Sequence, residues 1–149
     1  MRQPGSSHKL DQATLTELEG LDWGEPDYPS HLVVTCHEMR HKPIRELTDG
    51  EIRMAIGQQF SLPTLVPLAL ERLEPNPLLE ADFDEGDLWK VVLLAKPDFW
   101  TEHVDLWQQA NRMSQRAWVE TAAMDESWQQ TIAPDLKEAY DIFLLRKPD

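Results

Sequence analysis

The pattern that most directly suggests chemistry is His-Glu-Met-Arg-His over residues 37–41, which has the form H-E-x-x-H. On a helix, His37 and His41 can bind one zinc ion while Glu38 acts as a general base. Such zinc-binding helices are buried and largely uncharged, whereas this one carries charged residues, and Pro43 is expected to end it directly afterwards. We interpret the match as incidental and predict no catalytic residue, metal or cofactor. A zinc hydrolase using residues 37–41 stays the alternative.

A second group of chemistry-bearing residues is an acidic run between residues 80 and 87. Its five carboxylates lack the twelve-residue register and the terminal glutamate of an EF-hand, so no calcium site is predicted. Two interpretations are open: a solvated loop in which Asp84 or Asp87 caps the next helix, or a docking surface for a basic partner. The second interpretation assigns partner binding to Glu71, Glu74, Glu80, Asp82, Asp84, Glu85, Asp87 and Trp89. A further acidic stretch, residues 17–27, is expected to assist.

Tryptophan is frequent, with six residues in the chain. Each indole buries a large apolar surface and carries one N–H donor, so most of the six are expected in the core. An exposed tryptophan beside the acidic run would be a candidate interface anchor, because tryptophan is enriched among residues that dominate binding energy. Trp89 lies two residues after the run and is the predicted anchor.

The composition restricts the class of protein. The 149 residues include 27 acidic and 14 basic side chains, a formal net charge of −13, which repels nucleic acid and attracts basic proteins. No glycine-rich phosphate loop occurs, and the single cysteine, Cys36, cannot form an internal disulfide. The N-terminus lacks the apolar segment of a secretory signal, and the longest apolar stretches are too short to span a bilayer. We therefore expect a cytoplasmic protein that binds neither nucleic acid nor membranes.

The elements that must position these residues are expected to be helices, because apolar residues recur at helical spacing along the chain. Thr48 and Glu51 form a predicted capping box at one helix start. Residues 62–73 are apolar on nearly all sides and are predicted to form a central buried helix. Later in the chain, helices are expected over residues 97–113 and 114–131.

These elements together predict an all-α fold. We expect a single compact multi-helix domain over residues 14–149, with about seven or eight helices joined by short loops. Thr14 and Ser30 are expected to cap its first two helices. Residues 1–13 are polar and are expected to form a flexible N-terminus.

An ordered set of motifs between residues 30 and 100 resembles a helical family of immunity proteins from bacterial contact-dependent growth inhibition (CDI) systems. These motifs are Lys42-Pro43-Ile44, Ile56-Gly57-Gln58 at the end of a capped helix, Leu65-Val66-Pro67-Leu68-Ala69-Leu70-Glu71-Arg72-Leu73, Asn76-Pro77-Leu78, and Gly86-Asp87-Leu88. Two positions depart from the family pattern: Trp89 replaces the usual second leucine after Gly-Asp, and Phe60-Ser61 replaces a typical Asn-Ile-Gly turn. Because of these departures, the resemblance does not indicate which toxin the protein binds.

The resemblance implies a cytoplasmic protein that binds the C-terminal toxin domain delivered by neighbouring cells. Such toxins are commonly nucleases, and the immunity protein blocks them. This implication agrees with the charge, because a nuclease active site is basic and an acidic inhibitor can oppose its substrate surface. A generic acidic adaptor, whose carboxylates serve only solubility, stays a further alternative.

Overall fold

The computed structural model describes residues 12–20, 24 and 31–149. This part of the chain contains nine α-helices, two short 3₁₀-helices and no strand, so the predicted all-α fold is confirmed with one helix more than expected. The α-helices are α2 (Leu15–Glu19), α3 (His31–Met39), α4 (Asp49–Gly57), α5 (Leu62–Leu73), α6 (Asp87–Leu93), α7 (Pro97–Glu102), α8 (Val104–Glu120), α9 (Glu126–Thr131) and α10 (Ala133–Leu145). The flexible segment expected over residues 1–13 lies mostly outside the described residues. The cap expected at Ser30 lies wholly outside them.

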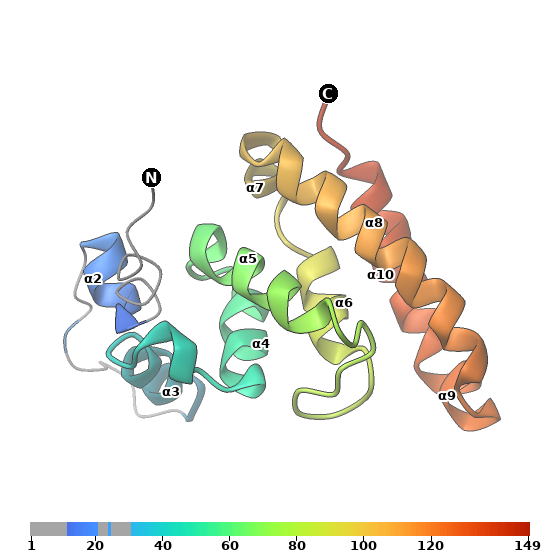
Figure 1. Cartoon of the computed structure of the whole chain (residues 1–149), viewed down its shortest axis with the longest axis horizontal. Coiled ribbons are helices and arrows are strands. Elements are labelled where there is room, and N and C mark those ends of the chain that lie inside the picture. The colour runs from blue at the N-terminus through green and yellow to red at the C-terminus, as the bar shows by residue number, and fades with distance from the viewer. Residues whose placement is uncertain (1–11, 21–23, 25–30) are drawn as a thin grey trace.

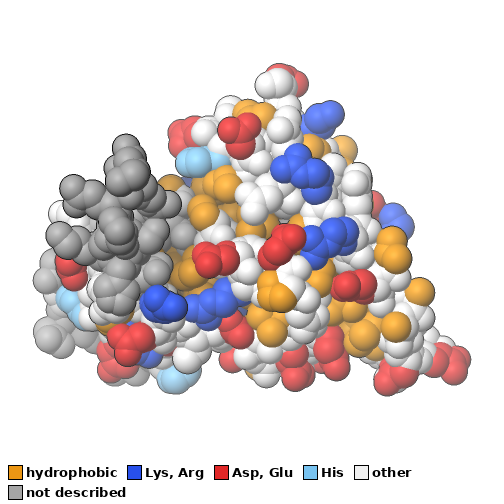
Figure 2. Space-filling view, in the orientation of Figure 1, with side chains coloured by type: hydrophobic (Ala, Val, Ile, Leu, Met, Phe, Trp, Pro, Cys, Tyr) orange, Lys and Arg blue, Asp and Glu red, His pale blue; other side chains and the backbone are white. Residues whose placement is uncertain are grey.

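Helices α5 and α6 occupy the middle of the molecule (Figure 1). Both contact α4 on one side, while α8 packs against α5 and α10 packs against α6 on the other. In the same orientation, acidic side chains gather along the lower edge of the face in view, where the connector between α5 and α6 lies (Figure 2). Within the described ranges, no helix is both long and apolar enough to cross a membrane.

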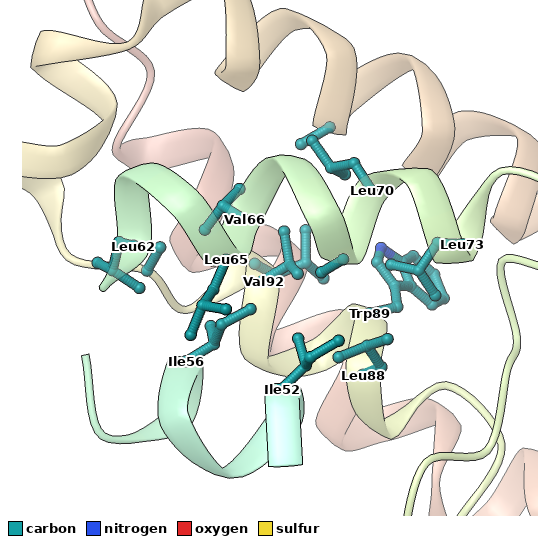
Figure 3. Packing of buried hydrophobic residues seen from close by; sticks show 14 of the residues in the cluster. Ile52, Ile56, Leu62, Leu65, Val66, Leu70, Leu73, Leu88, Trp89 and Val92 are labelled. Atoms are coloured by element: carbon teal, nitrogen blue, oxygen red, sulfur yellow. The ribbon is translucent and has the colours of Figure 1, made fainter. Parts of the chain in front are cut away.

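The core forms around α5, as its apolar sequence predicts. Six of its residues are buried: Leu62, Leu65, Val66, Ala69, Leu70 and Leu73. Ile52 and Ile56 of α4 approach this helix together with Leu88, Trp89 and Val92 of α6 (Figure 3). Each large apolar side chain buried in this way contributes about 1.5–3 kcal/mol relative to an exposed one. This packing fixes the position of α6 relative to α4, the two helices that hold the acidic run of residues 80–87 in place.

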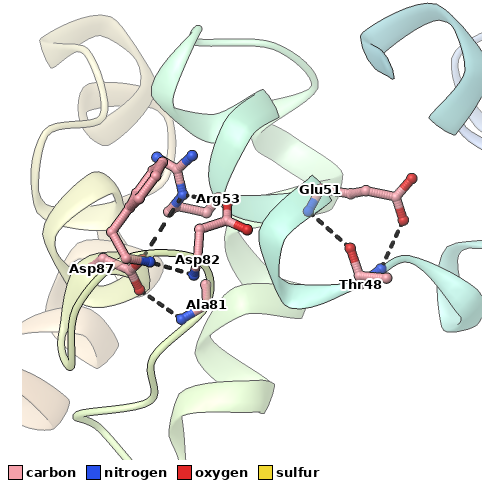
Figure 4. A network of polar contacts seen from close by, with 7 residues as sticks. Thr48, Glu51, Arg53, Ala81, Asp82 and Asp87 are labelled. Carbon is pink, nitrogen blue, oxygen red and sulfur yellow. Dashed lines mark hydrogen bonds and ion pairs between the residues drawn. The ribbon is translucent and has the colours of Figure 1, made fainter. Parts of the chain in front are cut away.

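Two helices begin with the side-chain caps that the sequence predicts. The Thr48 hydroxyl accepts the Glu51 N–H at 3.0 Å, and the Glu51 carboxylate accepts the Thr48 N–H at 2.9 Å, which completes the predicted capping box (Figure 4). The hydroxyl of Thr14 accepts the Glu17 N–H at 3.1 Å and caps α2 as expected. Each cap satisfies backbone donors that have no partner within the helix.

The helix boundaries in the C-terminal half differ from the prediction. Instead of a boundary near residue 113, the chain breaks at His103, and α8 continues unbroken to Glu120. His103 has a non-helical backbone (φ −136°, ψ 61°), and its ring Nδ1 lies 2.9 Å from the carbonyl oxygen of Phe99 within α7. A second helix start follows at Asp125, whose carboxylate accepts the Trp128 N–H at 2.8 Å. Apolar periodicity alone does not reveal these side-chain contacts with the backbone.

Candidate functional site

The acidic loop, residues 80–87, is the end of the connector that leads from α5 into α6. Glu80 and Glu85 form an isolated antiparallel β-bridge, so the loop folds back on itself. Gly86 closes it with a φ of 92°, a conformation that favours glycine, and donates its N–H to the Leu78 carbonyl at 3.1 Å. A side chain at position 86 would also press on Leu136 of α10. The loop therefore closes tightly against the core.

Asp87 holds the loop from inside. Its carboxylate accepts the backbone N–H groups of Ala81 at 2.7 Å, of Asp82 at 2.9 Å and of Phe83 at 2.9 Å (Figure 4). The prediction that Asp84 or Asp87 caps the next helix is wrong: Gly86 is the N-cap of α6 and no side chain bonds there. Asp87 lies one residue later and turns back to three donors that the loop leaves without backbone partners. Its negative charge also lies in the first turn of α6, where the helix dipole favours an anion.

Arg53 of α4 ties the loop to the neighbouring helix. Its Nε lies 2.8 Å from Asp82 Oδ2 and 4.0 Å from Asp87 Oδ2 (Figure 4). Gly50, in the first turn of α4, makes room for this contact, because a methyl group at that position would collide with the Asp82 carboxylate. Two of the five carboxylates in the acidic loop are thus paired within the fold.

The other three carboxylates of the loop face outward. Glu80, Asp84 and Glu85 are exposed and have no salt bridge to any residue that the structure describes. Phe83 lies among them with 69% of its surface exposed, and the Arg53 guanidinium carbon lies 4.7 Å from the centroid of its ring. Sequence reasoning missed Phe83. The available signal was an aromatic residue surrounded by acids in a stretch without helical periodicity.

Two hollows flank the outward-facing part of the loop. One, of about 210 Å³, extends from Phe83 and Asp84 to Lys90 and Asp135. The other, of about 190 Å³, is lined by Asp84, Glu85 and Asp125 together with residues of α9. The Trp128 indole N–H donates to the Glu85 carbonyl oxygen at 3.1 Å and joins α9 to the loop. The acidic surface therefore extends to Asp125, which sequence reasoning also missed because it lies far along the chain.

Trp89 is not at this surface, so its prediction as an exposed anchor is wrong. Its relative exposure is 0%, its indole N–H donates to Ser114 Oγ at 2.9 Å, and its ring packs edge-on against Trp118 with centroids 5.0 Å apart. Trp89 follows the loop in sequence, but position 89 of α6 faces α8. Its role is therefore to fix α6 in the core behind the loop.

The other two predicted partner-binding residues, Glu71 and Glu74, are not part of the acidic loop. Glu74 pairs with Arg116 of α8, with Nη1 and Oε1 2.6 Å apart. Glu71 is exposed on α5 and lines a separate hollow that includes Arg45. In the second acidic stretch the structure describes Glu17 and Glu19; the other three predicted acids, Asp22, Glu25 and Asp27, lie outside the described residues.

The H-E-x-x-H segment does not form a continuous helix. Helix α3 ends at Met39, so His41 lies in the turn that follows and does not share a helical face with His37. The ring Nδ1 of His37 is 3.1 Å from the Gly24 carbonyl oxygen. Arg40 between the histidines is only 2% exposed and pairs with Glu19 at 2.5 Å. Across the described residues, no group of three His, Cys, Asp or Glu side chains is arranged to hold a metal ion.

Comparison with known proteins identifies the family. No curated protein and no solved structure matches the chain. The model of the family described as CDI immunity proteins matches residues 17–110, which include α4, α5, the acidic loop and α6. Since this match covers more than half of the 149 residues, the chain belongs to the family of CDI immunity proteins.

Proposed function

We propose that this protein binds the C-terminal toxin domain of its cognate CDI effector through the outward side of the acidic loop and neutralises it. Membership of the immunity family implies toxin neutralisation. The observation that supports the assigned surface is the exposure of Glu80, Asp84 and Glu85 on a loop whose other carboxylates hold it in place. A fixed set of outward charges attracts a basic surface and orients the encounter.

The toxin that fits this surface is a nuclease acting in the cytoplasm. A nuclease must bind an anionic substrate, so its working surface is basic, and an acidic protein seated there blocks substrate by steric and electrostatic occlusion. The role requires no catalytic residue and no cofactor in the immunity protein. The net charge of −13 repels nucleic acid, so the partner is the toxin domain and not its substrate.

A charge-reversal experiment with a matched control tests the proposal. One variant carries Glu80→Lys, Asp84→Lys and Glu85→Lys; the control carries Glu38→Lys, Asp98→Lys and Glu102→Lys, which change the net charge equally on exposed positions of α3 and α7. Binding is measured by calorimetry with the purified toxin domain of the effector encoded beside this protein. We expect the loop variant to lose at least about 100-fold in affinity and the control less than about 5-fold.

Protection of cells gives the second measurement. Cells that express the toxin domain should grow with wild type or with the control variant, and should stop growing with the loop variant. Equal losses for both triple variants would show that only net charge matters and would reject the acidic loop as the binding surface. Failure of the wild-type protein to bind the toxin domain at all would reject the proposed partner.

A further inference from the structure

Phe83 is the aromatic side chain that the acidic loop presents to solvent. Its exposure of 69% exceeds that of Phe60, at 37%, and every other exposed large apolar residue that the structure describes is aliphatic. Single exposed apolar residues are common and need no explanation by themselves. Phe83 is of interest because it lies in the acidic loop and because contacts of the fold hold both its backbone and its ring.

The backbone of Phe83 is held through its N–H, which donates to Asp87 Oδ2 at 2.9 Å. The ring lies against the guanidinium of Arg53, 4.7 Å from carbon to centroid, and Arg53 is itself fixed by its 2.8 Å contact with Asp82. Arginine over an aromatic face is an attractive cation–π arrangement. The ring is therefore oriented before any partner arrives, so binding through it costs little conformational entropy.

The surroundings of Phe83 define the partner that would fit. Asp84 follows it directly, Glu80 and Glu85 lie on the same loop, and all three are exposed. An exposed apolar side chain on the same loop as several charges resembles the usual anatomy of a binding hot spot, in which a central anchor is desolvated and the polar rim excludes water. The complementary surface is an apolar pocket bordered by lysine or arginine side chains.

We infer that Phe83 is the anchor of the interface with the toxin domain, inserting into an apolar pocket with a basic rim, while Glu80, Asp84 and Glu85 steer the approach. This inference rests on the proposed function and adds to it a division of roles: the carboxylates set the association rate, and the phenyl ring sets the dissociation rate. It also replaces the buried Trp89 with an exposed aromatic side chain as the apolar contact.

Binding kinetics with the full chain and the immobilised toxin domain test this division. Phe83→Ala should weaken affinity at least about 30-fold, mainly by faster dissociation, and the loss should persist at high salt. The variant Glu80→Gln, Asp84→Asn and Glu85→Gln should slow association about 10-fold, and this loss should shrink as salt rises. Leu145→Ala serves as the control, because Leu145 is 87% exposed at the end of α10 and its replacement should change affinity less than 2-fold.

A further variant separates the anchor from a purely structural role. Phe83→Leu keeps apolar bulk without a ring and should retain affinity between that of Phe83→Ala and wild type, while all variants keep the wild-type circular dichroism spectrum. If Phe83→Ala behaves like the Leu145→Ala control while the neutralised acidic variant still associates slowly, the anchor is refuted and the acidic surface stands. If wild type binds but none of these variants changes the kinetics, the inference and the proposed surface both fail.

Discussion

Residues 37–41 and the acidic loop are both rich in ionisable side chains, but the fold uses them in opposite ways. In the first, the segment supplies a buried arginine, Arg40, which pairs with Glu19 of α2. In the second, the loop supplies carboxylates and receives Arg53 from α4. Only two of the five loop carboxylates approach Arg53, and the other three face solvent. Of the two segments, only the acidic loop therefore presents several exposed carboxylates.

The largest effect is expected from a substitution of Asp87, which holds the inward half of the loop, the part whose carboxylates are paired within the fold. Asp87→Ala removes the acceptor of three backbone N–H groups. A hydrogen bond to a charged group contributes about 1.5–3 kcal/mol, but water can replace part of the lost bonds in this exposed loop, so we expect the free energy of unfolding to fall by about 3 kcal/mol in total. Asp84→Ala, in the outward half, should change it by less than about 0.5 kcal/mol. Urea unfolding measures both. Equal effects of the two substitutions would contradict the division of the loop.

A smaller effect is expected from the corresponding contact in residues 37–41. Glu19→Gln removes the ion pair between Glu19 and the buried Arg40 and should cost about 2 kcal/mol; Glu19 is 28% exposed, so water can partly replace the carboxylate. Glu38→Gln, an exposed position in the same segment, is the control and should be neutral within about 0.5 kcal/mol. Toxin affinity should be unchanged in Glu19→Gln, because the Glu19 carboxylate is already paired with Arg40. A large loss of affinity would instead support the expected contribution of residues 17–27 to binding.

The smallest effect concerns Glu51 of α4, which lies between the two regions. Its carboxylate accepts a hydrogen bond from Lys42, directly after residues 37–41, and α4 also carries Arg53, which pairs with the acidic loop. Partial burial opposes ionisation of Glu51, but the Thr48 N–H and the Lys42 ammonium outweigh it and lower the pKa below the ordinary 4.5. A lowered folded-state pKa stabilises the protein above the unfolded value, and this contribution is lost as pH falls through the folded value. Glu51→Gln should therefore cost about 1 kcal/mol at pH 7.

Thermal unfolding of wild type and Glu51→Gln across a pH series checks this sign. The difference between them should be constant above pH 5 and should decrease as the pH falls further below 4.5. A difference that stayed constant down to pH 2 would show that the ionised carboxylate is not the stabilising form.

Much of the fold was predictable because its determinants are local. The capping box of Thr48 and Glu51 and the all-round apolar pattern of residues 62–73 depend on spacing along the chain, and both predictions are confirmed. The break at His103 was not predicted, since it involves a contact of its ring with a backbone carbonyl of the preceding helix. Helix periodicity gives the faces of helices more reliably than their ends.

The candidate site was predictable in composition but not in orientation. The run of acids identified the loop, but which carboxylates turn inward depends on Arg53, Gly50 and the backbone N–H groups that happen to lie nearby. Trp89 was misassigned because proximity in sequence to the loop says nothing about Ser114, its partner on α8. Phe83 was missed for the converse reason: a phenylalanine is expected in the core, and nothing local predicts that it stays outside.

The loop is held largely through its main chain: Asp87 accepts N–H groups of residues 81–83, and the Trp128 indole binds the carbonyl of Glu85. Main-chain groups are the same whatever side chain a residue carries. Positions 80, 83, 84 and 85 are therefore expected to accept other side chains while the scaffold stays folded, and under the proposed function they form a compact library for selecting variants that recognise a different toxin. In this respect the loop resembles an antibody hypervariable loop, with a constant frame and exchangeable specificity.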